Sequence, residues 1–446
     1  MRDVLILTFL AGALLMTVRY PFAGLLVWGW FTLATPHQAA YVAGSLPLNL
    51  MIAAITLVSF YFHGEFGRLK MTGLAWLILA FTIWLGVSQA FSLWPENSAE
   101  FTDRFVKVMV FILLCTTATT SRLRFHALLW TFASVMGFYA LKGGAYTILT
   151  LGSHRYEGID GTVLFDNNHM GIALATSVPV FLYLAQQVRG PLVRLALYGV
   201  ALSAVIAVVG TQSRGALVAL AALGGWTWLR SSRKIVTGLL GAACLLAALP
   251  FLPEHWTERM ATISEAAEDE SFMGRVDAWV INTQLAKENP LTGAGLRNPY
   301  VKDIAVTVSD REPRAAHSIY FEILGGTGFV GLALYLAMLA YGLLTAMLAE
   351  RRYAAEPGGR WRARFGRHAQ ASLIVFGVGG ASVSLEMWEG YLLLLALVGA
   401  LARVDIAATT ERPGFEIARI RRRAEIAQAR VRIKARVPKA RRPIEV

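Results

Sequence analysis

Recurrent apolar runs constrain the fold of this chain more than any other feature. They lie at about residues 4–18, 21–34, 46–62, 71–91, 104–119, 127–149, 169–187, 195–212, 214–230, 235–251, 318–349, 370–386 and 389–402. Several are shorter than the roughly 20 residues with which a helix crosses a bilayer, so the pattern predicts 12 or 13 membrane spans. Helices satisfy their backbone polar groups within one segment, which lipid requires. We therefore expect an all-α polytopic membrane protein.

The composition agrees with this expectation and excludes a soluble multidomain protein. Hydrophobic residues make up 56% of the 446 residues and charged residues only 16%. The formal net charge of +13 is concentrated at the end of the chain, because residues 403–446 hold 13 Lys and Arg against 5 Asp and Glu. Their apolar residues recur at helical spacing, which predicts a basic amphipathic helix on the anionic cytoplasmic leaflet. We therefore expect membrane lipids, and no nucleic acid, as partners of this tail.

Charges in the connections between runs predict the orientation. Basic connections lie at 63–70, 121–126, 188–194, 230–234 and 350–368. The connections 92–103 and 252–317 are acidic overall, and they alternate with the basic ones in the order that successive spans require. Because basic connections stay in the cytoplasm, we expect a cytoplasmic C-terminus and a periplasmic segment 252–317.

This orientation divides the chain into four parts. Residues 1–251 are N-terminal transmembrane helices, 252–317 one large periplasmic loop, 318–402 C-terminal transmembrane helices and 403–446 a basic cytoplasmic tail. A 66-residue connection is far longer than usual, and loops of that length are commonly functional or disordered. The Trp, Pro and Gly residues in this one favour an ordered, catalytic loop.

Three residues are the candidates for catalysis. Arg214 begins an apolar run, where a charge is costly and commonly faces a cavity, although an arginine that reaches the headgroups is the simpler alternative. Arg275 alone would indicate an ion pair with Asp277. His317 precedes the run at 318, and its ordinary pKa near 6.5 lets a histidine accept a proton at neutral pH. Nearby arginines would keep its ring neutral.

Three further residues are weaker candidates for binding substrate. Asp166 is a residue type that caps helices, so a capped helix start is its simplest interpretation. His169 adds to a polar cluster there that exceeds what capping needs. Glu322 either orients the His317 ring or is a satisfied polar group. The outer segments contain no metal-binding spacing and the chain no P-loop, so we expect neither a metal nor a cofactor.

Several motifs resemble those of a known group of enzymes. Residues 211–220 (TQSRGALVAL), GRVDAW at 274–279 with NPLTGAG at 289–295, and 317–331 (HSIYFEILGGTGFVG) resemble the successive motifs of the O-antigen ligase and polymerase superfamily. Residues 1–30, 138–150 (FYALKGGAYTILT) and 166–175 (DNNHMGIALA) are similar to the probable O-glycosylation ligases associated with the exosortase A system.

The resemblance implies an inner-membrane enzyme of the C-type glycosyltransferase class. Such an enzyme takes a glycan from undecaprenyl diphosphate on the periplasmic side, without a metal, and transfers it to an acceptor hydroxyl of a protein or of lipid A-core. The essential arginines of the family correspond to Arg214 and Arg275, and the essential histidine to His317. Arg297, in GAGLRN, is a rival for the loop arginine and a candidate substrate-binding residue.

Three alternatives remain at this point. A polymerase would use another lipid-linked repeat unit as its acceptor, and the residues separate it poorly from a ligase. A lipid-oligosaccharide transporter predicts a charged cavity at the bilayer midplane and short outer loops, unlike this chain. A structural envelope protein would not require Arg214 in an apolar run. The acceptor, the glycan and the oligomeric state cannot be read from these residues.

Overall fold

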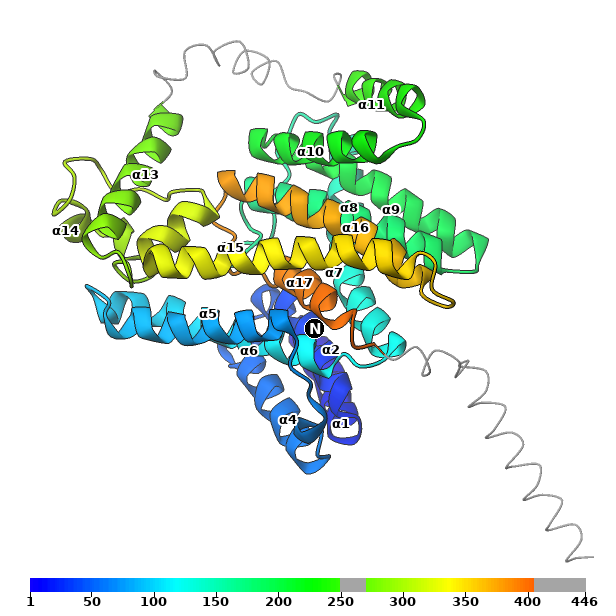
Figure 1. Cartoon of the computed structure of the whole chain (residues 1–446), viewed down its shortest axis with the longest axis horizontal. Helices are drawn as coiled ribbons and strands as arrows, with labels where there is room; N and C mark the ends of the chain where they lie inside the picture. The colour runs from blue at the N-terminus through cyan, green and yellow to red at the C-terminus, as the bar shows by residue number, and fades with distance from the viewer. Residues whose placement is uncertain (249–269, 405–446) are drawn as a thin grey trace, which may run out of the picture.

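The computed structural model describes residues 1–248 and 270–404, and within these ranges it contains helices and no strand (Figure 1). The helices before the predicted large loop are α1 (Arg2–Arg19), α2 (Pro21–Ala34), α3 (Val42–Ser45), α4 (Leu48–Phe62), α5 (Gly73–Ala90), α6 (Pro95–Ala118), α7 (Arg122–Leu149), α8 (Asn167–Gln187), α9 (Pro191–Gly210), α10 (Arg214–Arg230) and α11 (Lys234–Ala248). Those that follow are α13 (Glu270–Glu288), α14 (Lys302–Ala305), α15 (Ile319–Tyr353), α16 (Arg360–Gly379) and α17 (Glu389–Ala400). Short 3₁₀ helices include η2 (Phe66–Arg68), η5 (Asn298–Tyr300) and η6 (Gly380–Ser382).

Every predicted apolar run contains a helix, which confirms an all-α polytopic membrane protein. Within the described ranges, α5, α8, α9 and α15 are long and apolar enough to cross a membrane by themselves. Others, such as α2, α4 and α17, are apolar but shorter. The predicted tail helix lies outside the described residues.

Helix boundaries differ most from the edges of the apolar runs in two places. The acidic connection predicted at 92–103 is mostly the first turns of α6, which starts with Pro95 in the first turn and with Glu96 near its N-terminus. The run predicted at 370–386 is also displaced: α16 begins at Arg360 and ends at Gly379, and residues 383–388 form a loop. Helix formation depends on backbone hydrogen bonds and capping, so a helix extends past its apolar part.

Close approach of helices depends on small residues. A Cβ on Gly144 of α7 would lie 2.1 Å from Ser203 Oγ of α9, and one on Gly210 would lie 1.8 Å from Thr147 Oγ1. In lipid the hydrophobic effect does not drive helices together, so such close packing and hydrogen bonds stabilise the bundle. The helix α17 is buried throughout, between α5, α6, α7, α15 and α16 (Figure 1).

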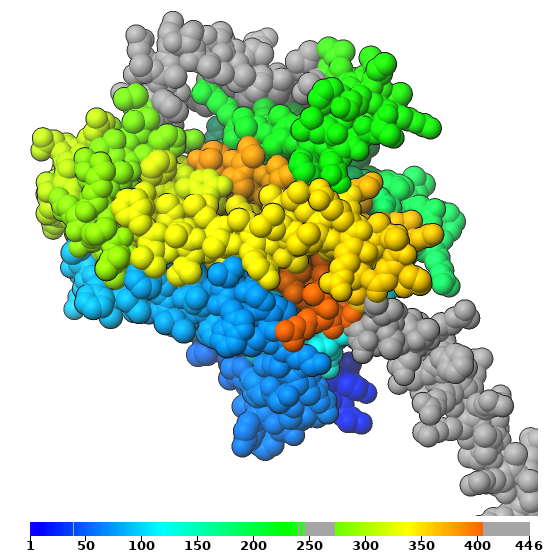
Figure 2. All heavy atoms as spheres, in the orientation of Figure 1, coloured from blue at the N-terminus to red at the C-terminus, as the bar shows by residue number. Residues whose placement is uncertain are grey.

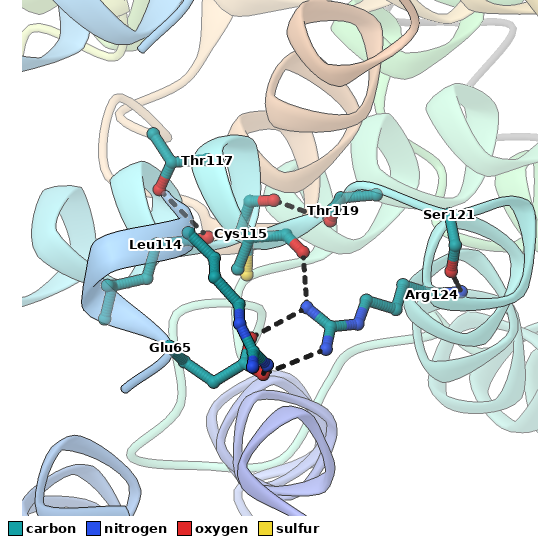
Figure 3. Close-up of polar contacts among 9 residues, drawn as sticks. Glu65, Leu114, Cys115, Thr117, Thr119, Ser121 and Arg124 are labelled. Atoms are coloured by element: carbon teal, nitrogen blue, oxygen red, sulfur yellow. Dashed lines mark hydrogen bonds and ion pairs between the residues drawn. The ribbon is translucent and has the colours of Figure 1, made fainter. Parts of the chain in front are cut away.

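One basic connection is held by a buried carboxylate. Glu65, between α4 and α5, accepts hydrogen bonds from Arg124 Nη1 at 3.1 Å and Arg68 Nη1 at 2.9 Å (Figure 3). Arg124 also donates to the Ala118 carbonyl at 3.0 Å. Burial raises the pKa of Glu65, but the two arginines outweigh it and the net pKa is lowered. The connection 63–70 is thereby tied to the start of α7.

The long helix α15 is interrupted at Gly328, whose φ of 71° and ψ of −175° are not helical. The carbonyls freed there accept hydrogen bonds from the NPLTGAG motif: Ala294 N donates to Gly325 O at 2.8 Å and Gly295 N to Gly326 O at 3.1 Å. Ser88 Oγ of α5 also donates to Gly326 O, at 2.9 Å. Irregular backbone at membrane depth requires such partners from the protein. Figure 2 shows α15 in yellow, with the α13–α14 region beside its beginning and α5 along it.

Candidate active site

The described part of the large loop, residues 270–317, packs on the beginning of α15 (Figure 1). The NPLTGAG motif inserts at the break in α15, as described above. Helix α13, which carries the GRVDAW motif, packs along the same part of α15. The two loop motifs therefore place the predicted loop arginine, Arg275, beside the start of α15, where His317 lies.

His317 has an unusual backbone conformation immediately before α15. Its φ is 45°, in the left-handed region that few non-glycine residues adopt. Trp279 Nε1 donates to the preceding carbonyl of Ala316 at 2.8 Å, and the Trp279 ring stacks on Phe321 with centroids 5.1 Å apart. The tryptophan of GRVDAW thus holds the turn that presents His317. Strain of this kind persists where surrounding structure imposes it, and it is commonest at functional sites.

The His317 ring is half-buried among charged residues. Burial lowers its pKa, and Arg275, His169 and Arg297 lower it further, whereas Asp166 opposes them. Its Nδ1 is buried and has no hydrogen-bond partner among the described residues. Four of the other predicted site residues therefore lie within electrostatic reach of His317, and together they favour a neutral ring that can accept a proton.

The DNNH segment (166–169) and the TQSR segment (211–214) are hydrogen-bonded to each other, and these bonds join the first turns of α8 and α10. Asp166 caps α8 by accepting from the backbone N–H groups of Asn168 and His169, at 2.8 and 3.3 Å, as its residue type predicts. Ser213 caps α10 and donates through Oγ to Asn168 Oδ1 at 2.7 Å. Arg214 is the first residue of α10 and is exposed.

Gly171 allows α8 and α10 to pack closely here, because a Cβ at this position would lie 2.5 Å from Ala216 Cβ. Asn167 Nδ2 donates to the Thr211 carbonyl at 2.8 Å. Asn167 and Asn168 therefore set where Arg214 lies relative to Asp166 and His169. One feature of the sequence indicates this role: two asparagines follow the capping residue, and a single helix cap does not need both.

Arg297 belongs to a separate cluster of aromatic and acidic residues near His317. Its guanidinium lies over the rings of Phe101 and Tyr300, at 4.7 and 4.9 Å from their centroids. Burial opposes its charge, but Tyr300 and the carboxylates of Glu386 and Glu322 outweigh this and raise the pKa of Arg297. Arg297, Glu322 and Glu386 line a cavity of about 10 Å³, room for roughly one water molecule. Arg297 is therefore surrounded by protein groups that stabilise its charge.

Glu322 belongs to the same cluster. Its Oε1 accepts from Tyr300 Oη and from Ser384 Oγ, the latter at 2.7 Å. These bonds link η5, α15 and the loop before α17. Of the two interpretations left open above, these contacts favour a satisfied polar group over one that orients His317. The sequence does not predict a role for Tyr300, Ser384 or Glu386, because these residues are far apart in the chain and none belongs to a recognisable motif.

Comparison with known proteins identifies part of this arrangement. Residues 198–336 match the family model described as O-Antigen ligase, which includes α10, α13, His317 and the break in α15. This part of the chain, residues 198–336, is similar to the O-antigen ligases. This confirms the resemblance at superfamily level and establishes a membrane enzyme of glycan assembly, of the O-antigen ligase and polymerase type.

The remaining comparisons add less. Residues 1–189 match a model described as a family of unknown function (DUF5935). The search of curated proteins found no match to this chain. A solved structure titled "Structural coordination of polymerization and crosslinking by a peptidoglycan synthase complex" matches with 18% identity over 74% of this chain and 97% of that chain, at a TM-score of 0.38. That similarity is too low to relate individual residues.

Proposed function

We propose that the chain is a membrane glycan ligase that transfers a glycan from undecaprenyl diphosphate to an acceptor hydroxyl at the periplasmic face of the inner membrane. The observation that carries this proposal is the grouping of His317 with Arg275, Asp166, His169 and Arg297, next to the capped start of α10. The family match supplies the reaction class. The donor, the acceptor and the orientation in the membrane are parts of this proposal.

Arg214 and Arg275 bind the diphosphate in this proposal. A planar guanidinium forms paired, charge-assisted hydrogen bonds with phosphate oxygens. The N-termini of α8, α10 and α15 lie at this end of the bundle, and helix N-termini favour anions. Negative charge that develops on the leaving diphosphate is thereby stabilised by groups already in position.

His317 acts as the general base. Its ring takes the proton of the acceptor hydroxyl as that oxygen attacks the anomeric carbon and the bond from this carbon to the phosphate oxygen breaks. The undecaprenyl diphosphate leaves with the bonding electron pair. One displacement inverts the anomeric centre. Arg297 lies between two rings and near two carboxylates, so in this proposal it has a structural role. Arg275 is then the loop arginine that binds the diphosphate.

Reconstitution of the full chain tests the proposal. Purified protein, a lipid-diphosphate glycan and each acceptor class in turn should give a product with one acceptor and inverted stereochemistry. Transfer that continues in excess EDTA would support the arginine pair as the source of positive charge, and recovery only after Mg²⁺ is restored would contradict it. A ladder of products on lipid-linked repeats would establish a polymerase instead. Absence of transfer with every acceptor would reject both.

A further inference from the structure

A second polar site lies at the opposite end of the helices that carry the candidate active site. Helices α8, α10 and α15 begin at Asn167, Arg214 and Ile319 beside His317, and end at Gln187, Arg230 and Tyr353. A cavity of about 590 Å³ lies among the ends of these helices and the start of α16. This volume is in the range of ligand pockets, roughly 300–1,000 Å³.

Arginine dominates the lining of this cavity. Its charged residues are Arg230, Arg351, Arg360, Arg364, Arg367 and Glu350. The Glu350 carboxylate is already paired, because it accepts hydrogen bonds from Arg230 Nη2 at 2.5 Å and from Arg367 Nε at 2.8 Å. Among the residues that the structure describes, Arg351, Arg360 and Arg364 form no ion pair with a carboxylate. The cavity therefore has a large excess of positive charge.

The wall of the cavity is held in place by close packing of α15 and α16. A Cβ on Gly366 would lie 2.6 Å from the Ala346 carbonyl oxygen and 3.0 Å from Glu350 N. Gln370 Nε2 donates to Glu350 Oε2 at 2.9 Å. The single carboxylate is thus fixed against α16, and the arginines around it are spaced by two packed helices. The arginine side chains are exposed to solvent in this cavity, and the helix packing fixes the spacing of their backbones.

The position of the cavity favours a lipid over a soluble ligand. From Phe329, just after the break, to Arg351, α15 rises about 33 Å, roughly the thickness of the hydrocarbon core of a bilayer. Trp226 and Trp228 lie in the last turns of α10, as residues at a membrane–water interface do. On α15, the exposed Leu344 and Leu348 share a helix face with Arg351, which suits an acyl chain.

We propose that this cavity binds the phosphodiester headgroup of an anionic phospholipid. Guanidinium groups match phosphate oxygens in charge and geometry, and basic pockets between membrane helices suit such headgroups. The chain's own tail, residues 403–446, is a poor occupant because its net charge of +8 has the same sign as the cavity. The site is distinct from the candidate active site, and its test does not depend on glycan transfer.

Lipid titration of the full chain tests the proposal. Wild type, Arg351→Gln/Arg364→Gln and the matched control Arg189→Gln/Arg194→Gln are purified in neutral detergent. The control removes two arginines from the basic connection 188–194, which does not line the cavity. Phosphatidylglycerol, phosphatidylcholine and inorganic pyrophosphate are titrated against each, and bound lipid is counted by native mass spectrometry. Arg360→Gln/Arg364→Gln provides a second cavity variant in case the first does not fold.

We expect phosphatidylglycerol to bind wild type and control alike, and to bind the cavity variants about thirtyfold more weakly, from two lost arginine–phosphate contacts. Binding to wild type should also weaken as salt is raised, and phosphatidylcholine should bind all proteins equally poorly. Equal binding of phosphatidylglycerol to wild type and both cavity variants would overturn the proposal. So would pyrophosphate binding without any preference for phosphatidylglycerol, which would assign the cavity to a soluble phosphate.

Discussion

At the scale of single residues, the chemistry depends on which groups surround His317. The ring is half-buried, and burial and the Arg275 charge both lower its pKa. A histidine with a lowered pKa is neutral over more of the pH range, which a base needs and an ion-pairing residue does not. Within the described ranges, the Nδ1 atom of this ring has no hydrogen-bond partner.

Removal of the base should stop transfer and leave donor binding intact. His317→Ala is expected to lower the rate about 10²–10⁴-fold. His317→Gln should be equally inactive, because the amide has similar reach and cannot accept the proton. Transfer and donor binding are measured in parallel on purified, folded protein. An active His317→Gln variant would exclude a proton-transfer role.

The pH profile follows from the sign of the pKa shift. Because the pKa of His317 is lowered, the ring stays neutral to a lower pH than a free histidine, and the rate should hold through neutrality. It should fall only as pH drops below the ordinary histidine value of about 6.5. Rates from pH 5 to 8.5, with circular dichroism to confirm folding, check this. A half-maximal rate above pH 7 would contradict the direction of the shift.

The arginines should differ in their tolerance of lysine. Arg214→Lys and Arg275→Lys should lose most activity, because lysine cannot form the paired contacts of a guanidinium. Arg311→Lys is the matched control, since Arg311 belongs to the same loop and forms an ion pair with Asp277. An inactive Arg297→Lys beside a fully active Arg275→Lys would transfer the loop-arginine role to Arg297.

At the scale of elements, the break in α15 links the loop to the bundle. Gly328 has φ of 71°, and its neighbours Gly325 and Gly326 accept hydrogen bonds from the NPLTGAG motif. The same helix carries His317 at its start, so the loop and the base are positioned by one interruption. Ala294 and Gly325 are hydrogen-bonded although they are 31 residues apart in sequence, so the two motifs act as one structural unit.

Substitution at the break should therefore be costly. A Cβ on Gly328 would lie 2.2 Å from the Leu291 carbonyl oxygen, and the left-handed conformation adds strain. Gly328→Ala is expected to destabilise the fold by about 3 kcal/mol or more and to lower activity. Gly86→Ala, in α5 with nothing within 4 Å, is the control and should be neutral or stabilising. Thermal unfolding in detergent measures both. Equal stability of the two variants would refute the tight contact.

At the scale of the whole molecule, the positions of the charged connections bear on the predicted orientation in the membrane. The basic connection 350–368 lies at the end of α15 that is remote from His317, and the described part of the large loop, residues 270–317, lies at the other end. Four helices are long and apolar enough to span a membrane within the described ranges. The orientation itself rests on the excess of Lys and Arg in the short connections and stays a prediction.

Accessibility labelling tests that orientation. A cysteine at the exposed Asp310 should react with a membrane-impermeant reagent in intact cells, because residues 252–317 are predicted to be periplasmic. A cysteine at the exposed Arg189, on a basic connection, should react only after the cells are opened. A reporter after Val446 should show cytoplasmic activity. Labelling of the cysteine at position 189 but not of the one at position 310 in intact cells would contradict the predicted orientation.

The sequence by itself determined what is local. Hydropathy located the helices because each must satisfy its own backbone in lipid, and residue types such as Asp166 predicted a helix cap that the structure contains. Motif order identified the superfamily and marked Arg214, Arg275 and His317 as candidates.

Only the tertiary structure decided what depends on contacts between distant segments. It placed Asp166, His169 and Arg275 around His317, enclosed Arg297 between Phe101 and Tyr300, and assigned Glu322 to Tyr300 and Ser384. It ended α16 at Gly379 and grouped the arginines of three helices around one cavity. The physical reason is that side-chain packing and hydrogen bonds between helices set these distances, and no periodicity within one helix encodes which residues of another it meets.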